Sequence, residues 1–76
     1  MATKAYVLIE TTVGSNREII NALKKTNGVT WVDMVTGPFD LVAMVEAASL
    51  ADVGDVVTGR IHPIHGITRT VTCLVI

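Results

Sequence analysis

Cysteine is nearly absent: Cys73 is the only one in 76 residues. An intramolecular disulfide is therefore excluded, and a reducing compartment is expected. No stretch approaches the ~20 apolar residues of a membrane-spanning helix. The apolar run after Lys4 ends at Glu10, so it is too short for a signal peptide. These absences indicate a cytoplasmic protein with no membrane contact.

Charge is also scarce. Only 17% of the residues are charged, the net charge is −1, and Lys24-Lys25 is the nearest thing to a basic run. A protein that binds a nucleic-acid backbone needs a basic patch to neutralise phosphates. Direct nucleic-acid binding is therefore not expected.

The motifs of common enzymes are missing. There is no serine–histidine–carboxylate set, phosphate-binding loop or dinucleotide fingerprint, and the six glycines lie at separate element boundaries. His62 and His65 are two residues apart in a loop and could form half of a metal site. No third ligand is evident, so the alternative is a pair of exposed loop residues near an interface. We expect no cofactor, no metal and no catalysis.

Apolar residues, in contrast, are abundant. Half of the chain is hydrophobic, and the mean hydropathy is +0.55. A chain of this length forms one domain, here residues 1–76, and buries only about 60% of the surface that its unfolded form exposes. Exposed apolar surface usually marks an interface. A partner subunit is therefore expected.

The first half of the chain predicts a strand, a helix and a second strand. Residues 4–12 are rich in β-branched residues and apolar on both sides in the middle, which is typical of a central strand. Ser15 to Glu18 has the form of a capping box, with the Ser15 hydroxyl accepting from the Glu18 amide. The helix that follows is expected to end near Thr26, before Asn27-Gly28. Residues 29–36 have mixed polarity on both faces, which favours an edge strand.

The second half predicts a strand, a helix and a last strand. Residues 39–46 are apolar on both sides and follow a short turn at Gly37-Pro38, so they form a hairpin with residues 29–36. Ser49 caps a helix that is expected to end near Gly59. Gly54 inside this helix is unfavourable, and close packing is the one reason we can offer. A linker over 60–66 precedes a strand over 67–76.

Strict alternation assigns the side chains of both outer strands to faces. In the strand over 29–36, one face carries Val29, Trp31, Asp33 and Val35. In the last strand, Thr68, Thr70 and Thr72 share one face, and the other carries Ile67, Arg69, Val71, Cys73 and Val75.

The element order is βαββαβ. Right-handed crossovers place both helices on one face of a four-stranded antiparallel sheet in the order 4-1-3-2. The two-sided apolar strands then lie in the centre. Their second face has no cover within the chain, so the periodicity predicts a dimer that forms through this face.

Several residues are candidates for chemistry, and each has a plainer interpretation. Asp40 could receive an ammonium group, or it could bond its own turn backbone. Thr70 and Thr72 could bind a ligand carboxylate, or they could reflect ordinary strand propensity. Cys73 could be a nucleophile but suits a small apolar strand residue. Trp31 could stack on a ligand or serve in packing.

Two segments together resemble a known family. Thr36-Gly37-Pro38-Phe39-Asp40, followed by an apolar strand, resembles the Thr-Gly-x-x-Asp hairpin of the Lrp/AsnC effector-binding domain, also called the RAM domain. The stretch from Gly66 to Thr72 resembles its last strand, and Gly28-Val29 fits the start of its second strand. The resemblance covers nearly the whole chain.

The resemblance implies a ferredoxin-like α+β fold, face-to-face dimers, and rings of dimers, often octameric. It implies that a small effector, usually an amino acid, binds between dimers and is lined by the hairpin turn and the last strand. Carried over to this sequence, the site comprises Thr36, Gly37, Pro38, Phe39, Asp40, Thr70 and Thr72. Pro38 has no backbone N–H, so it cannot donate a hydrogen bond to the carboxylate of the effector.

Family regulators also carry an N-terminal helix-turn-helix domain. The first strand here begins near Lys4, so the resemblance is to the stand-alone form. The leading hypothesis is an amino-acid-sensing module that acts through homo-oligomer assembly or on full-length Lrp/AsnC regulators. The alternatives are a small dimeric enzyme that uses His62 or His65, and a purely structural oligomerisation partner. The effector, the ring size and the regulator partner stay open.

Overall fold

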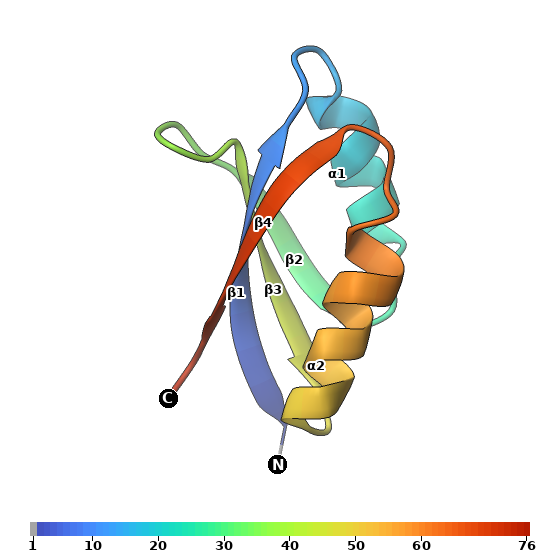
Figure 1. Ribbon diagram of the computed structural model, residues 1–76, viewed down its shortest axis with the longest axis vertical. Helices are drawn as coiled ribbons and strands as arrows, with labels where there is room; N and C mark the ends of the chain where they lie inside the picture. Colours follow the sequence, from blue (N-terminus) through green and yellow to red (C-terminus); the bar gives the residue numbers. More distant parts are fainter. Residues whose placement is uncertain (1) are drawn as a thin grey trace.

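The structure is a computed structural model that describes residues 2–76 (Figure 1). Met1, the first residue of the predicted domain, lies outside the described residues. The elements in order are β1 (Thr3–Thr11), α1 (Asn16–Lys24), β2 (Val29–Met34), β3 (Leu41–Ala47), α2 (Leu50–Val56), the π-helical η1 (Val57–Ile61) and β4 (Ile67–Leu74).

The four strands form one antiparallel sheet in the order β2-β3-β1-β4. Both helices cover the same face of this sheet, and no element of residues 2–76 covers the opposite face (Figure 1). The predicted βαββαβ topology, strand order and α+β class are confirmed. The two strands that are apolar on both sides, β1 and β3, are the central pair.

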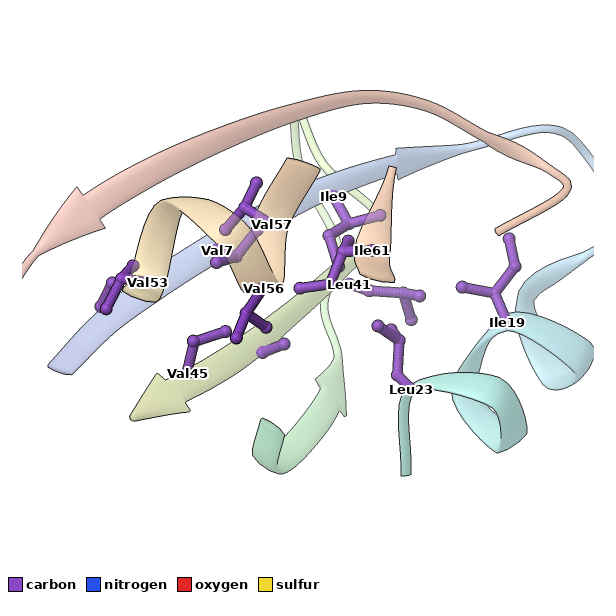
Figure 2. Close-up of a cluster of buried hydrophobic side chains, with 12 residues drawn as sticks. Val7, Ile9, Ile19, Leu23, Leu41, Val45, Val53, Val56, Val57 and Ile61 are labelled. Atoms are coloured by element: carbon purple, nitrogen blue, oxygen red, sulfur yellow. The ribbon is translucent and has the colours of Figure 1, made fainter. Parts of the chain in front are cut away.

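The core lies between the sheet and the helices (Figure 2). Alternate residues of β1 and β3 point into it, because side chains on one face of a strand recur every second residue. The helices contribute to the same layer, and the fully buried larger side chains are Val7, Ile9, Ile19, Leu23, Leu41, Val45, Val53 and Ile61.

The prediction that Ile61 lies in a linker is wrong. The second helix continues past Gly59 as the wider π-helix η1, in which the His62 amide donates to the Val57 carbonyl at 2.9 Å. This extension brings Ile61 to complete burial. Burial of Ile61 therefore determines where the helix ends, whereas Gly59 was expected to end it.

Each edge strand has a register irregularity near its start that strict alternation did not predict. Val29 pairs with Val45 and Trp31 with Met44, so Thr30 is the extra residue of β2. A similar shift in the β1–β4 pairing leaves Thr68 as the extra residue of β4. A bulge of this kind reverses the facing of the residues before it.

The bulges correct two predicted faces. Val29 does not share a face with Trp31, and Ile67 does not share one with Val71. Both Val29 and Ile67 pack against the core instead. Each edge strand thus adds an apolar side chain to the covered face of the sheet.

The two predicted helix caps have different outcomes. The Ser49 hydroxyl accepts from the Asp52 amide at 3.1 Å, so that cap is confirmed. The Ser15 cap is wrong, because Ser15 has helical backbone angles and its hydroxyl lies 2.9 Å from the Thr12 hydroxyl. A capping residue normally has extended backbone, which aims its oxygen at the free amides of the first turn.

The connection between β2 and β3 is longer than the short turn predicted. β2 ends at Met34 and β3 begins at Leu41, so both strands stop two residues early at this end. The Val35 amide donates to the Asp40 carbonyl at 3.0 Å and closes the loop. Gly37 has a φ of 141°, in the region that favours glycine, and Pro38 cannot donate to a ladder.

Gly28→Ala is expected to reduce the free energy of unfolding by about 1–3 kcal/mol. Gly28 has a φ of 98°, and an added Cβ would lie 2.9 Å from a Val56 methyl group. Gly54→Ala is the matched control, because a Cβ at this position would meet no atom within 4 Å. The same open space shows that close packing within the chain is not the reason for a glycine at position 54. Gly54→Ala should add about 0.5–1 kcal/mol. Urea denaturation measures both, and a Gly28→Ala variant as stable as the parent would contradict this account.

Candidate functional site

Asp40 lies where the start of β3 meets the end of β1. Its amide donates to the Ile9 carbonyl at 2.9 Å, which continues the sheet ladder by one bond. Its carboxylate Oδ2 accepts from the Thr11 amide at 2.8 Å and lies 3.3 Å from the Thr11 hydroxyl. The carboxylate therefore bonds a residue 29 positions away and not the turn itself. Asp40 fastens the loop over 35–40 to the neighbouring strand.

Thr11 continues this polar chain toward the first helix. Its hydroxyl also donates to Oδ1 of Asn16, the first residue of α1. One hydroxyl proton thus has two acceptors within reach, one on Asp40 and one on Asn16. The loop, the end of β1 and the start of α1 are joined through a single side chain.

A second contact holds the loop to the far edge of the sheet. The Arg69 guanidinium lies 5.3 Å from the centre of the Phe39 ring, within the range of a cation–π interaction. The loop extends on the side of the sheet away from the helices (Figure 1). Phe39 therefore reaches over the end of β1 to the start of β4.

Thr70 and Thr72, the two threonines predicted for the site, lie on the helix-covered face of the sheet, whereas the loop over 35–40 extends from the opposite face (Figure 1). Thr70 pairs with Ile9 and Thr72 with Val7, and both partners point into the core. Directly opposite residues of an antiparallel pair share a face. The threonines therefore face the helix side of β4, where the Thr70 hydroxyl shares a hydrogen bond with Nε2 of His62.

The predicted site residues are therefore not gathered within one subunit. β1 separates β3 from β4, and two strand spacings place the backbones of Leu41 and Thr70 about 10 Å apart. Thr72 lies a further ~7 Å along its strand. Thr36, Gly37 and Pro38 are exposed in the loop, whereas Phe39 and Asp40 are half-buried.

The face of the sheet opposite the helices receives apolar side chains from all four strands, and Asp33, opposite Val42, is a charged residue at its β2 edge. Tyr6 and Trp31 make an edge-to-face contact with ring centres 6.1 Å apart, and they shelter Met44 between them. Tyr6 is 42% exposed and Trp31 is 40% exposed, although both are large apolar side chains. We call this surface the open face; its members are Tyr6, Leu8, Trp31, Val42, Met44, Val71 and Cys73.

Charged residues border the open face at both ends. Lys4 and Glu46 are paired across β1 and β3 with a separation of 3.7 Å. At the other end, Glu10 lies opposite Arg69. An apolar centre with a charged rim is the usual anatomy of a protein interface.

Three residues next to the candidate site were not predicted from the sequence: Thr11, Asn16 and Arg69. Thr11 could have been found, since the antiparallel pairing of β1 and β3 brings the end of one strand to the start of the other. No sequence pattern indicated that Asn16 and Arg69 would lie next to the site. Their contacts depend on side-chain directions that the strand order does not specify.

Other kinds of site are not formed by the described residues. Within residues 2–76 there is no group of three or more histidine, cysteine or acidic side chains that could hold a metal. Cys73 is exposed on the open face, and His62 is engaged with Thr70. No helix in this part of the chain is long and apolar enough to cross a membrane.

These features define a class: a small α+β domain with one covered sheet face, one open apolar face and an anchored hairpin loop. Comparison with known proteins gives the family. A model of the Lrp/AsnC ligand binding domain matches residues 4–76, and the chain belongs to that family.

Known relatives agree with this assignment. An uncharacterized HTH-type transcriptional regulator of Pyrococcus furiosus is 33% identical over 75 residues, which cover 95% of this chain and 50% of the relative. The chain thus spans about half the length of the curated relatives it matches. A crystal structure of a protein from Thermus thermophilus has 35% identity and a TM-score of 0.92, with 97% and 92% of the two chains covered.

The fold also occurs at low identity. A Neisseria meningitidis transcriptional regulator, solved in complex with L-Met, has a TM-score of 0.89 at 13% identity. The match covers 97% of this chain and 49% of that regulator. At this level of identity the comparison establishes the fold.

Asp40→Ala is expected to lower the free energy of unfolding by about 1–2 kcal/mol, because it leaves the Thr11 amide without its acceptor. Asp40→Asn keeps a carbonyl oxygen at this position and should recover most of the loss. Asp55→Ala, which removes an exposed carboxylate from α2, is the control and should change stability by less than about 0.5 kcal/mol. Chemical denaturation gives all three values, and equal stability of Asp40→Ala and the parent would refute the anchoring role.

Proposed function

We propose that this domain is a regulatory ligand-binding module that senses an amino acid at the loop over 35–40. The observation that carries the proposal is the half-buried Asp40 carboxylate, in a turn that resembles the hairpin motif of the family. The Thr11 amide and the Thr11 hydroxyl both donate to Oδ2 of this carboxylate. An ammonium group approaching Oδ1 would gain a charge-assisted hydrogen bond without displacing the Thr11 amide.

The carboxylate of the ligand needs donors in turn. The Gly37 amide and the hydroxyls of Thr70 and Thr72 are the groups we propose. If Nε2 of His62 carries the proton, it donates to the Thr70 oxygen and leaves the Thr70 hydroxyl proton for a ligand. His62 then acts by orienting Thr70 and does not contact the ligand.

The loop and the threonines lie on opposite faces of one subunit, so a complete site requires two subunits. We propose that the loop of one subunit meets the last strand of another. A ligand held between subunits favours assembly by mass action. The effect is reciprocal, because assembly raises the affinity for the ligand by the same factor.

The open face supports the first step of assembly, a homodimer. An apolar surface across four strands, bordered by charges, is costly to leave in water. A second copy offers a surface of the same size and the same apolar character. The ligand-bridged contact would then join dimers into a ring, octameric in the form that the family resemblance implies.

The output that we propose is transcriptional regulation. The relatives matched at 31–33% identity are named HTH-type transcriptional regulators, and a regulator with this fold was solved with L-Met. The domain would change the assembly of such regulators when its amino acid binds. Family membership favours this function over catalysis.

The amino-acid hypothesis predicts a rise in melting temperature with one or a few of the twenty amino acids. At a hundredfold excess over the dissociation constant the gain is about 2.7 kcal/mol, or roughly 15 °C for a domain of this size. Asp40→Asn should abolish the shift, because an amide does not attract an ammonium group as a carboxylate does. Asp55→Asn is the matched control and should keep the shift. A shift that survives in Asp40→Asn would remove the site from this loop.

The dimer hypothesis predicts that light scattering finds a multiple of the 8.1 kDa subunit mass. Leu8→Arg places a charge in the middle of the open face and should give monomers, since a desolvated unpaired charge costs several kcal/mol. Val13→Arg, at a fully exposed loop position, is the control and should leave the mass unchanged. A Leu8→Arg variant with the parent's mass would show that subunits associate elsewhere.

A further inference from the structure

A groove lies between the first helix and the end of β2, on the covered side of the sheet. Its volume is about 520 Å³, and its lining residues are Asn16, Arg17, Ile20, Asn21, Lys24 and Met34. None of them belongs to the loop over 35–40 or to β4. The groove therefore has its own lining residues, although Asn16 connects it through Thr11 to the Asp40 carboxylate of the site proposed above.

Spacing along α1 explains the lining. Residues at positions i, i+3, i+4 and i+7 share one face of a helix, and Arg17, Ile20, Asn21 and Lys24 have this spacing. At 1.5 Å per residue, Arg17 and Lys24 are about 10 Å apart along the axis. Ile20 lies between them, half-buried against the core.

Met34 completes an apolar floor. It is the last residue of β2 and is 63% exposed, which is high for a methionine at the end of a strand. Together with Ile20 it offers the apolar contact, while the two cations stand at either end. The surface is amphipathic, with positive charge at its ends and apolar atoms in the middle.

The charges of Arg17 and Lys24 are not neutralised by ion pairs within residues 2–76. The ion pair in this part of the chain joins Lys4 and Glu46. No acidic residue lines the groove. Glu18 lies on the same helix but points about 100° away from Arg17 around the axis.

The side-chain amide of Asn16 adds a hydrogen-bond donor to the groove. Its Oδ1 already accepts from the Thr11 hydroxyl, so its NH₂ group is the part left to bond a ligand. The groove therefore combines two cations, an amide donor and an apolar floor. An anion with an apolar body satisfies all three.

We infer that this groove is a second ligand site and that it binds amphipathic carboxylates, such as aliphatic carboxylic acids. Its volume lies within the ~300–1,000 Å³ usual for small-molecule sites. Two cations are too few for a nucleic-acid backbone. A zwitterionic amino acid would bring an ammonium group between two cations with no acid to receive it, so the groove and the Asp40 loop select different ligands.

The test is a titration of the isotope-labelled full chain with octanoate at low salt, followed by NMR chemical shifts of the backbone amides. Changes should gather at residues 16–24 and 34. Octylammonium has the same apolar chain and the opposite charge, so it should bind more weakly. Sodium chloride should weaken octanoate binding, because exposed charges are screened by salt.

Charge-removing variants make the result specific. Arg17→Gln and Lys24→Gln should each weaken octanoate binding about two- to fivefold, as expected of exposed ion pairs. Lys25→Gln is the matched control: it removes the same charge from the neighbouring exposed residue, which does not line the groove. Its affinity should equal that of the parent.

Several outcomes would overturn the inference. Shifts centred on Tyr6 and Trp31 would place octanoate on the open face. Equal binding of octylammonium, or equal loss in Lys25→Gln, would remove the role of the groove's cations. Acetate binding as tightly as octanoate would mean an unselective anion patch. A change of oligomer mass in Arg17→Gln without octanoate binding to the parent would make the groove a contact between subunits. None of these outcomes depends on whether an amino acid binds at Asp40.

Discussion

The structure depends on one constraint: two helices cover only one face of a four-stranded sheet. Burial of alternate residues of β1 and β3 against the helices supplies the core, and at roughly 25 cal/mol per Å² of apolar area it is the dominant favourable contribution to folding. The same strands are apolar on their other side, where Tyr6, Leu8 and Met44 lie. The proposed association of subunits rests on this apolar area, which the two helices leave uncovered.

Three of those surfaces have different chemistry, so one small fold can serve several contacts. The open face is apolar with a charged rim and suits a second copy. The loop over 35–40 carries the Asp40 carboxylate, which is anchored through Oδ2, while its Oδ1 accepts no hydrogen bond from residues 2–76. The groove beside α1 carries cations and no acid. Thr11 connects two of them, since its hydroxyl reaches both Asp40 and Asn16. A ligand that moved either acceptor would change the bonds available to the other.

Thr70 illustrates how a motif residue and its surroundings combine. On its own, a threonine in a strand is ordinary, and the family pattern is what made it a candidate. Within the subunit its hydroxyl is bound to His62, a residue whose role the sequence left open. The pairing does not remove Thr70 from the proposed site. In the proposed site, this contact would orient the Thr70 hydroxyl.

Much of the fold was determined by the sequence, because period-two apolarity in β1 and β3, the glycine stops and the element order are local signals that agree with one another. The family resemblance was also visible in the sequence, and the family match over residues 4–76 confirms the family. The tertiary structure decided the rest: the bulges that turn Val29 and Ile67 into the core, the burial of Ile61 and the partner of the Asp40 carboxylate. These depend on register and on contacts between residues far apart in the chain, and a local pattern carries no information about either. The turn at Thr36 to Asp40 could thus be recognised from the sequence, whereas its attachment to Thr11 required the folded sheet.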